Sequence, residues 1–177
     1  MEKILITLHI NDKPCEVMVY PNDTLLEVLR DELDLTGSKE SCGEGVCGSC
    51  TIQMDGKPVR SCLTLAMEAQ GTRIKTVEGL ANEEELSDLQ QSFIDHGAVQ
   101  CGFCTPGMLI SADALLNENP RPDKKTIRKA LAGNICRCTG YAKIIEAVAH
   151  TNNPQESCPD CITGSKTGSK PNKIQGE

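Results

Sequence analysis

Tryptophan is absent from this sequence of 177 residues, and only two phenylalanines and two tyrosines occur. Aromatic side chains therefore supply little apolar area, so Leu, Ile, Val and Ala must fill whatever core the chain builds. A chain of this length forms one or two small domains, which excludes a large catalytic barrel. We expect so small a core to need a further source of stability, and the eleven cysteines are the candidates.

The sequence also lacks a run of about eighteen apolar residues, which excludes a membrane-spanning helix. Residues 1–10 include Glu2, Lys3 and His9 and show neither a basic region nor twin arginines, so no secretory signal is evident. The expected location is therefore the cytoplasm, where thiols stay reduced or bind metal ions.

Positive charge is in deficit, with 18 basic against 25 acidic side chains and a net charge of −7. The acidic residues are concentrated in the first half of the chain. This balance argues against nucleic acids and anionic membranes as partners.

The first half of the chain is typical of strands and turns with one helix. The expected strands cover residues 4–8, 15–19, 50–53, 57–59 and 73–77. Asn11-Asp12-Lys13-Pro14 and Asp55-Gly56 supply turns for two hairpins. Asp23 or Thr24 can cap a helix whose leucines recur at helical spacing. We therefore predict a small mixed sheet with a helix packed across it over residues 1–77.

The second half is typical of helices. The expected helices cover residues 83–96, 106–117, 124–132 and 141–149. Asp123 is the expected cap of the third, and Gly97 and Gly133 are expected stops. Four helices of this length predict a compact four-helix bundle over residues 78–150, so the fold class is α+β. Residues 151–177 lack apolar periodicity and are interpreted as a flexible tail.

The first cysteine group is Cys42-x4-Cys47-x2-Cys50, followed by Cys62. Three glycines between Cys42 and Cys50 allow the backbone to wrap closely around a small inorganic core and to direct N–H groups at sulfur. Three closely spaced cysteines and a distant fourth have the spacing of plant-type [2Fe–2S] ferredoxins. The spacing therefore predicts a [2Fe–2S] site, and the hairpins and helix around it fit a plant-type ferredoxin-like β-grasp domain over residues 1–77.

The second cysteine group is Cys101-x2-Cys104 with Cys136-x-Cys138 further along the chain. If the helices are as expected, both pairs lie near helix N-termini, where free N–H groups favour an anionic thiolate cluster. The separation of Cys136 and Cys138 is too short for the usual zinc knuckle.

These segments resemble the small iron–sulfur subunit of the xanthine oxidase family of molybdenum hydroxylases over about residues 1–150. The resemblance rests on Gly43-Glu44-Gly45-Val46-Cys47-Gly48-Ser49-Cys50, Gln100-Cys101-Gly102-Phe103-Cys104-Thr105-Pro106-Gly107 and Cys136-Arg137-Cys138-Thr139-Gly140-Tyr141. It implies two [2Fe–2S] clusters, one held by each cysteine group, in a subunit that transfers electrons and has no substrate site of its own.

The resemblance also implies two partner subunits. One is a large catalytic subunit that binds molybdopterin, and the other is a medium subunit that binds FAD. The glutamine matched by Gln100 contacts the pterin in the family, and the cysteine matched by Cys138 lies beside it. Electrons are then expected to pass from molybdenum through the helical-domain cluster and the ferredoxin-domain cluster to the flavin.

The cysteines also permit other interpretations. Four disulfides are disfavoured in a reducing compartment, and zinc fits the cysteine spacings poorly. The alternatives are a zinc-stabilised adaptor and a stand-alone ferredoxin-like carrier. Cys15 is expected to be a small buried apolar side chain, and the three histidines are interpreted as structural or surface residues. Cys158-Pro159-Asp160-Cys161 is interpreted as adventitious because no third ligand is evident near it.

Overall fold

A five-stranded mixed sheet forms the first half of the chain in the computed structural model, which describes residues 2–82 and 85–152. The strand order is β2-β1-β5-β3-β4. β1 pairs antiparallel with β2 and parallel with β5, and β3 pairs antiparallel with both β4 and β5. The strands are β1 (Ile4–Ile10), β2 (Lys13–Val19), β3 (Thr51–Met54), β4 (Lys57–Arg60) and β5 (Arg73–Lys75).

The first hairpin has a shorter turn than the sequence suggested. Only Asn11 and Asp12 lie between β1 and β2, and both have a positive φ, as a two-residue hairpin turn requires. Lys13 and Pro14, expected in the turn, are the first residues of β2. Pro14 is accommodated because β2 is an edge strand, where proline, which has no N–H, need not donate a hydrogen bond to a second neighbouring strand.

The predicted helix of the first half begins as α1 (Leu25–Glu27) and continues as the π-helical segment η1 (Val28–Glu32). Thr24 caps it: its Oγ1 accepts from Glu27 N at 3.2 Å, and the Glu27 carboxylate accepts from Thr24 N at 2.8 Å. Leu25 and Leu29 are fully buried against the sheet. Three short 3₁₀ segments complete this half: η2 (Ser61–Leu63), η3 (Ala66–Ala69) and η4 (Val77–Gly79).

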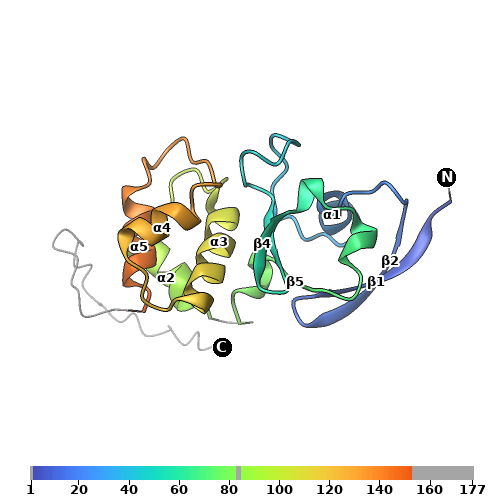
Figure 1. Cartoon of the computed structure of the whole chain (residues 1–177), viewed down its shortest axis with the longest axis horizontal. Helices are drawn as coiled ribbons and strands as arrows, with labels where there is room; N and C mark the ends of the chain where they lie inside the picture. The colour runs from blue at the N-terminus through green and yellow to red at the C-terminus, as the bar shows by residue number, and fades with distance from the viewer. Residues whose placement is uncertain (1, 83–84, 153–177) are drawn as a thin grey trace, which may run out of the picture.

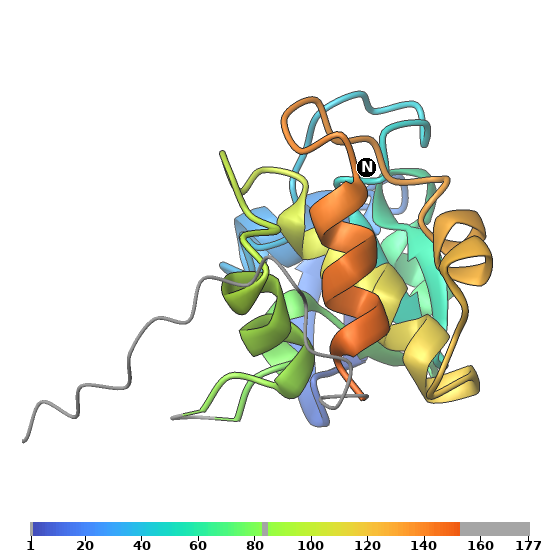
Figure 2. The same ribbon diagram turned by 90° about the vertical axis from the view of Figure 1, so that its left-hand side faces the viewer.

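Four helices follow and pack around a second group of buried apolar side chains. They are α2 (Asp88–Asp95), α3 (Thr105–Glu118), α4 (Lys124–Ala130) and α5 (Ala142–His150). Figure 2 shows this layer face on, with α5 in the centre. Asp123 caps α4, as expected, by accepting from Thr126 N at 2.7 Å. Among the described residues, no helix is long and apolar enough to cross a membrane.

Two of these helices, α2 and α5, begin later than expected, and all four end one or two residues away from the expected position. α2 begins at Asp88, because Ser87 and Gln90 form a capping box there. The helix was expected from residue 83, and residues 83–84 lie outside the described part of the chain. α4 ends at Ala130 rather than at 132, and α5 begins after Tyr141, whose left-handed φ of 68° is not helical.

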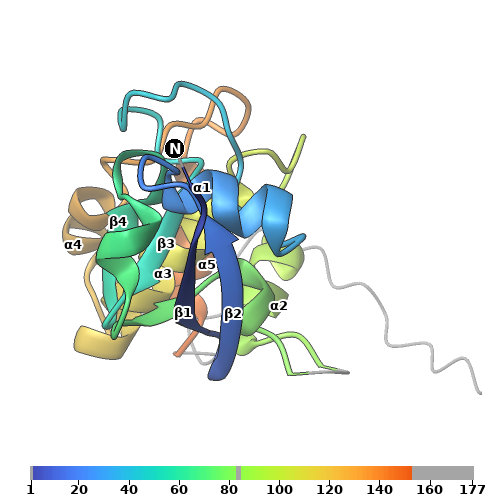
Figure 3. The same cartoon turned by 90° about the vertical axis from the view of Figure 1, so that its right-hand side faces the viewer.

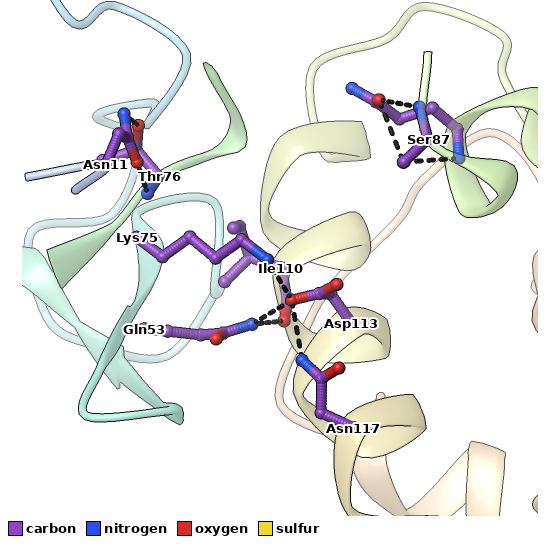
Figure 4. A network of polar contacts seen from close by, with 9 residues as sticks. Asn11, Gln53, Lys75, Thr76, Ser87, Ile110, Asp113 and Asn117 are labelled. Carbon is purple, nitrogen blue, oxygen red and sulfur yellow. Dashed lines mark hydrogen bonds and ion pairs between the residues drawn. The ribbon is translucent and has the colours of Figure 1, made fainter. Parts of the chain in front are cut away.

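The sheet and the helices meet along α3, as Figures 1 and 3 show. Gln53 on β3 donates to Asp113 on α3 at 2.8 Å and to the Ile110 carbonyl at 3.1 Å, and Lys75 on β5 pairs with the same Asp113 carboxylate at 3.0 Å (Figure 4). A polar seam therefore separates two apolar cores. The predicted domain limits of 77 and 150 stay predictions, and residues 153–177 of the predicted tail lie outside the described residues.

Candidate metal centres

The first cysteine group gathers in the loop between η1 and β3. Cys50 directly precedes β3, and Cys62 lies in η2, so the β3–β4 hairpin brings their sulfurs to 3.3 Å. Cys42 Sγ accepts from the N–H groups of Glu44 and Cys47 at 3.4 and 3.5 Å. Gly43, Gly45 and Gly48 all have a positive φ, which the expected wrapping of the loop requires.

The thiols of this loop differ in their acidity. The N–H groups of Cys47 and Glu44 lower the pKa of Cys42 to about 6, so this sulfur is largely a thiolate at neutral pH. Burial and the neighbouring Cys50 raise the pKa of Cys62 to about 11. Cys62 therefore gives up its proton readily only when a cation is bound beside it.

The second cysteine group is assembled by two loops. Cys101 and Cys104 precede α3, with Cys104 at its N-cap, while Cys136 and Cys138 lie in the loop before α5. Cys101 and Cys138 approach to 3.6 Å between sulfurs. Burial and the adjacent Cys136 raise the pKa of Cys104 to about 12. The eight predicted ligands thus form two separate groups of four thiols.

Cys136 is the sulfur of this second group with the most polar contacts. The Thr139 hydroxyl donates to its Sγ at 3.1 Å. Burial opposes ionisation of Cys136, but the Thr139 hydroxyl and the N–H groups of Thr139 and Cys138 together lower its pKa below the usual value. The Tyr141 hydroxyl accepts from Cys136 N at 2.9 Å and fixes the start of the loop.

The loops of the two groups touch each other along one side of the molecule, at the top of Figures 1 and 2. Ile135 N donates to the Cys47 carbonyl at 2.8 Å. Asn134 is buried and donates to the Gly48 carbonyl at 3.0 Å and to Thr51 Oγ1 at 3.1 Å, while its own oxygen accepts from Ser111. One hydrogen bond therefore joins Cys47, a predicted ligand of the first group, to Ile135, which precedes Cys136, a predicted ligand of the second.

Arg60 strengthens the same junction. Its guanidinium donates to the Gly133 carbonyl at 2.6 Å, to Thr51 Oγ1 at 2.8 Å and to the Gly45 carbonyl at 3.3 Å. The sequence interpretation missed Arg60, Asn134 and Thr139. Arg60 and Asn134 could be found only by their nearness in sequence to Cys62 and Cys136, while Thr139 stood within the Cys136–Tyr141 motif with no role assigned to it.

Gln100 and Cys138, the expected pterin contacts, are both exposed. Apolar side chains are exposed around the same loops: Val46, Phe103 and Ile135 each have between 46% and 61% of their surface accessible. Single exposed apolar residues are ordinary, but three at one junction of loops favour a protein interface.

Among the described residues, Cys15 and the three histidines belong to neither of the two groups. Cys15 is half-buried on β2 against the first core, and His9 is exposed on β1. His96 and His150 stack with ring centres 4.9 Å apart. Cys158 and Cys161 lie outside the described residues.

Comparisons with known proteins agree with these groups. A family model described as "2Fe-2S iron-sulfur cluster binding domain" matches residues 8–81, and one described as "[2Fe-2S] binding domain" matches residues 76–149. The nicotinate dehydrogenase small FeS subunit of Eubacterium barkeri is 48% identical over 150 residues, which are 85% of this chain and 96% of that protein. The xanthine dehydrogenase iron-sulfur-binding subunit of Escherichia coli O157:H7 is 45% identical over 150 residues, 83% of this chain and 93% of its own length.

Solved structures give the same result. A chain of quinoline 2-oxidoreductase from Pseudomonas putida 86 superposes with a TM-score of 0.82 at 51% identity, covering 84% of this chain and 92% of that one. The fold and the two family matches define a protein with two [2Fe–2S]-binding domains. The chain belongs to the family of small iron–sulfur subunits of molybdenum hydroxylases of the xanthine dehydrogenase type.

Proposed function

We propose that the chain carries electrons between a molybdenum site and a flavin, through one [2Fe–2S] cluster in each cysteine group. Cys42, Cys47, Cys50 and Cys62 hold the first cluster, and Cys101, Cys104, Cys136 and Cys138 hold the second. Each group offers four thiols and N–H groups directed at sulfur, which is the donor set that such a cluster requires. When bound, each cluster accepts and releases one electron at a time.

The single observation that carries this proposal is the hydrogen bond from Ile135 N to the Cys47 carbonyl. Ile135 is joined by one peptide bond to Cys136, a proposed ligand of the second cluster. The chain therefore provides a short route of covalent bonds and one hydrogen bond between the two proposed ligand sets. An adaptor stabilised by zinc has no need for such a route.

The partners proposed for the chain are a large subunit that binds molybdopterin and a medium subunit that binds FAD. The exposed Gln100 and Cys138 support a pterin contact beside the second group. The second cluster then receives electrons from molybdenum, and the first passes them on to the flavin; the order reverses if the complex reduces its substrate. The subunit is proposed to act in the cytoplasm, with its helical half as a four-helix bundle.

Paramagnetic resonance on the assembled complex tests this order. Magnetic coupling to Mo(V) is expected to be strong for the cluster of the second group and weak for that of the first. Stronger coupling to the cluster of Cys42, Cys47, Cys50 and Cys62 would reverse the order. The stand-alone carrier is favoured instead if the chain purifies without partners and accepts electrons with both clusters loaded.

Replacing Gln100 by alanine is expected to weaken the contact with the pterin without loss of iron. Removing one or two buried hydrogen bonds costs about 1–3 kcal/mol. Transfer from molybdenum to the second cluster, followed by rapid-freeze paramagnetic resonance, should slow, while iron content stays that of the unsubstituted complex. A drop in iron content would instead give Gln100 a structural role.

Thr139→Val is expected to lower the reduction potential of the second cluster. The hydroxyl donates to Cys136 Sγ at 3.1 Å, and a donor at a ligand sulfur stabilises the reduced, more negative cluster. A loss of about 1 kcal/mol corresponds to roughly 40 mV for one electron. Thr139→Ser keeps the hydroxyl and serves as the control in the redox titration. Equal potentials in the valine and serine variants would exclude this role.

A further inference from the structure

Arg60 places a positive charge between the two cysteine loops. It is the last residue of β4, two positions before Cys62, and its side chain is half-buried. Its Nε donates to the Gly45 carbonyl in the first loop at 3.3 Å, and its Nη2 donates at 2.6 Å to the carbonyl of Gly133, three residues before Cys136. One guanidinium therefore contacts the loops of both proposed clusters.

The guanidinium of Arg60 is held firmly in this position. Besides the two carbonyls, Thr51 Oγ1 at the start of β3 accepts from Nη1 at 2.8 Å. A Cβ at Gly133 would lie 2.3 Å from Nη2, so a side chain at that position would push the guanidinium away. The rigid fork of arginine suits several acceptors at once, which lysine cannot match. The charge therefore stays at a constant place relative to both loops.

No carboxylate neutralises Arg60 within residues 2–82 and 85–152. The salt bridges in this part of the chain involve three lysines and no arginine. All the acceptors of the guanidinium are neutral oxygens, two carbonyls and one hydroxyl. An arginine keeps its positive charge in a folded protein, and a cation withdrawn from water costs stability unless an anion lies near it. The thiolates of the two adjoining loops are the anions that this position offers.

A fixed cation changes the reduction potential of an iron–sulfur cluster beside it. A [2Fe–2S] cluster bound by four thiolates has a net negative charge, which grows when an electron arrives. A nearby positive charge therefore stabilises the reduced state more than the oxidised state and raises the reduction potential. Solvent and salt screen a half-buried charge less than an exposed one. Because Arg60 contacts both loops, the effect falls on both clusters.

We infer that Arg60 tunes the two clusters together, its charge raising both reduction potentials. The inference rests on the proposed function, since it requires a [2Fe–2S] cluster in each cysteine group. Arg60 itself gains and loses neither a proton nor an electron; each cluster takes up one electron and passes it on. Its role differs from that of Thr139, whose hydroxyl donates to a sulfur of the second group alone.

The test is a redox titration of the full-length, iron-loaded protein, followed by paramagnetic resonance. Arg60→Gln removes the charge and should shift the reduction equilibrium of each cluster about tenfold toward the oxidised state, which is about 59 mV for one electron. Arg60→Lys keeps the charge but loses the fork, so both potentials should stay near those of the unsubstituted protein while the melting temperature falls. Arg73→Gln removes an exposed arginine on β5 and controls for net charge; it should shift neither potential.

Arg60→His supplies a second test that holds if the glutamine variant fails to bind iron. The imidazole is charged below about pH 6.5 and neutral above it. Both potentials of this variant should therefore rise as the pH falls through that range, by more than those of the unsubstituted protein. The comparison is made within one protein, so it does not depend on how the substitution affects the junction of the loops.

Several results would overturn the inference while leaving the proposed function intact. These are two clusters in Arg60→Gln with either potential unchanged, an equal fall in the lysine and glutamine variants, and potentials of Arg60→His that follow those of the unsubstituted protein at every pH. An equal fall in the lysine variant would assign the effect to the hydrogen bonds instead of the charge. An unsubstituted chain that binds no [2Fe–2S] cluster would contradict the proposed function, and the inference with it.

Discussion

Gly48→Ala is expected to lower the melting temperature of the iron-loaded protein by roughly 6–12 °C. A Cβ at this position would lie 2.3 Å from the Gly133 carbonyl oxygen and 2.9 Å from Asn134 Cα, so the two cysteine loops would have to separate. The φ of +74° adds strain for any side chain. Strain and overpacking together cost roughly 3 kcal/mol, and each kcal/mol lowers the melting temperature by about 2–4 °C in a chain of this size.

Two matched variants separate contact from strain. Gly43 is in the same loop with a φ of +65°, but a Cβ there meets no atom within 4 Å, so Gly43→Ala reports strain alone. Gly107 lies within α3, where alanine ordinarily adds about 1 kcal/mol of stability, yet its Cβ would lie 2.3 Å from the Gly48 carbonyl oxygen. Gly107→Ala should therefore destabilise. Equal melting temperatures for the Gly43 and Gly48 variants would show that the loops are not in tight contact.

Removal of iron is expected to unfold at least the helical half of the protein. Two binuclear clusters imply about four irons and four acid-labile sulfides per chain. Without the clusters, the half-buried Cys104 and the buried Cys136 lose the bound group that is expected to join the loop before α3 to the loop before α5, and the core has few large side chains to compensate. Circular dichroism at the helix minimum, recorded anaerobically before and after chelation, measures the loss.

Single ligand variants refine this result. Cys62→Ser should leave about two irons per chain, because the second group is intact, while Cys15→Ser should leave all four. A chain that is fully folded with zinc in both cysteine groups and no iron would refute the iron–sulfur assignment and support the adaptor. The raised pKa values of Cys62 and Cys104 also predict how iron binding depends on pH. Because binding releases the protons of these two thiols, the affinity for iron should fall as the pH falls.

Local rules predicted most of the elements of this fold. Alternation predicted β1, and burial alternates along it from Leu5 to Ile10, while Ile4 at its start is exposed. Caps placed α1 and α4. The errors lie where two local signals compete. The turn residues around Pro14 predict a longer turn than the structure has, because only the order of the strands shows that Pro14 lies on an edge strand. The acidic residues 83–85 favour a first helical turn, and they compete with Ser87, which is the N-cap from which α2 starts.

The candidate site was predictable only as far as its motifs extend. Cysteine spacing identified both groups, since four ligands of one cluster must come from a few short segments. It said nothing of Arg60 or Asn134, which act between segments far apart in the chain: Asn134 reaches the Gly48 carbonyl across 86 positions. Such contacts depend on how the sheet packs against α3, and no periodicity within one element reports that packing.

The hydrogen bond between Ile135 N and the Cys47 carbonyl has a consequence for evolution, because both of its partners are main-chain atoms. Any substitution of Ile135 that keeps the backbone N–H leaves this hydrogen bond in place. The exposed side chain at position 135 can therefore vary without loss of the bond, for example to suit different partner proteins. Proline alone removes the donor. The main-chain connection between the two cysteine loops is therefore kept while the exposed side chain at position 135 changes.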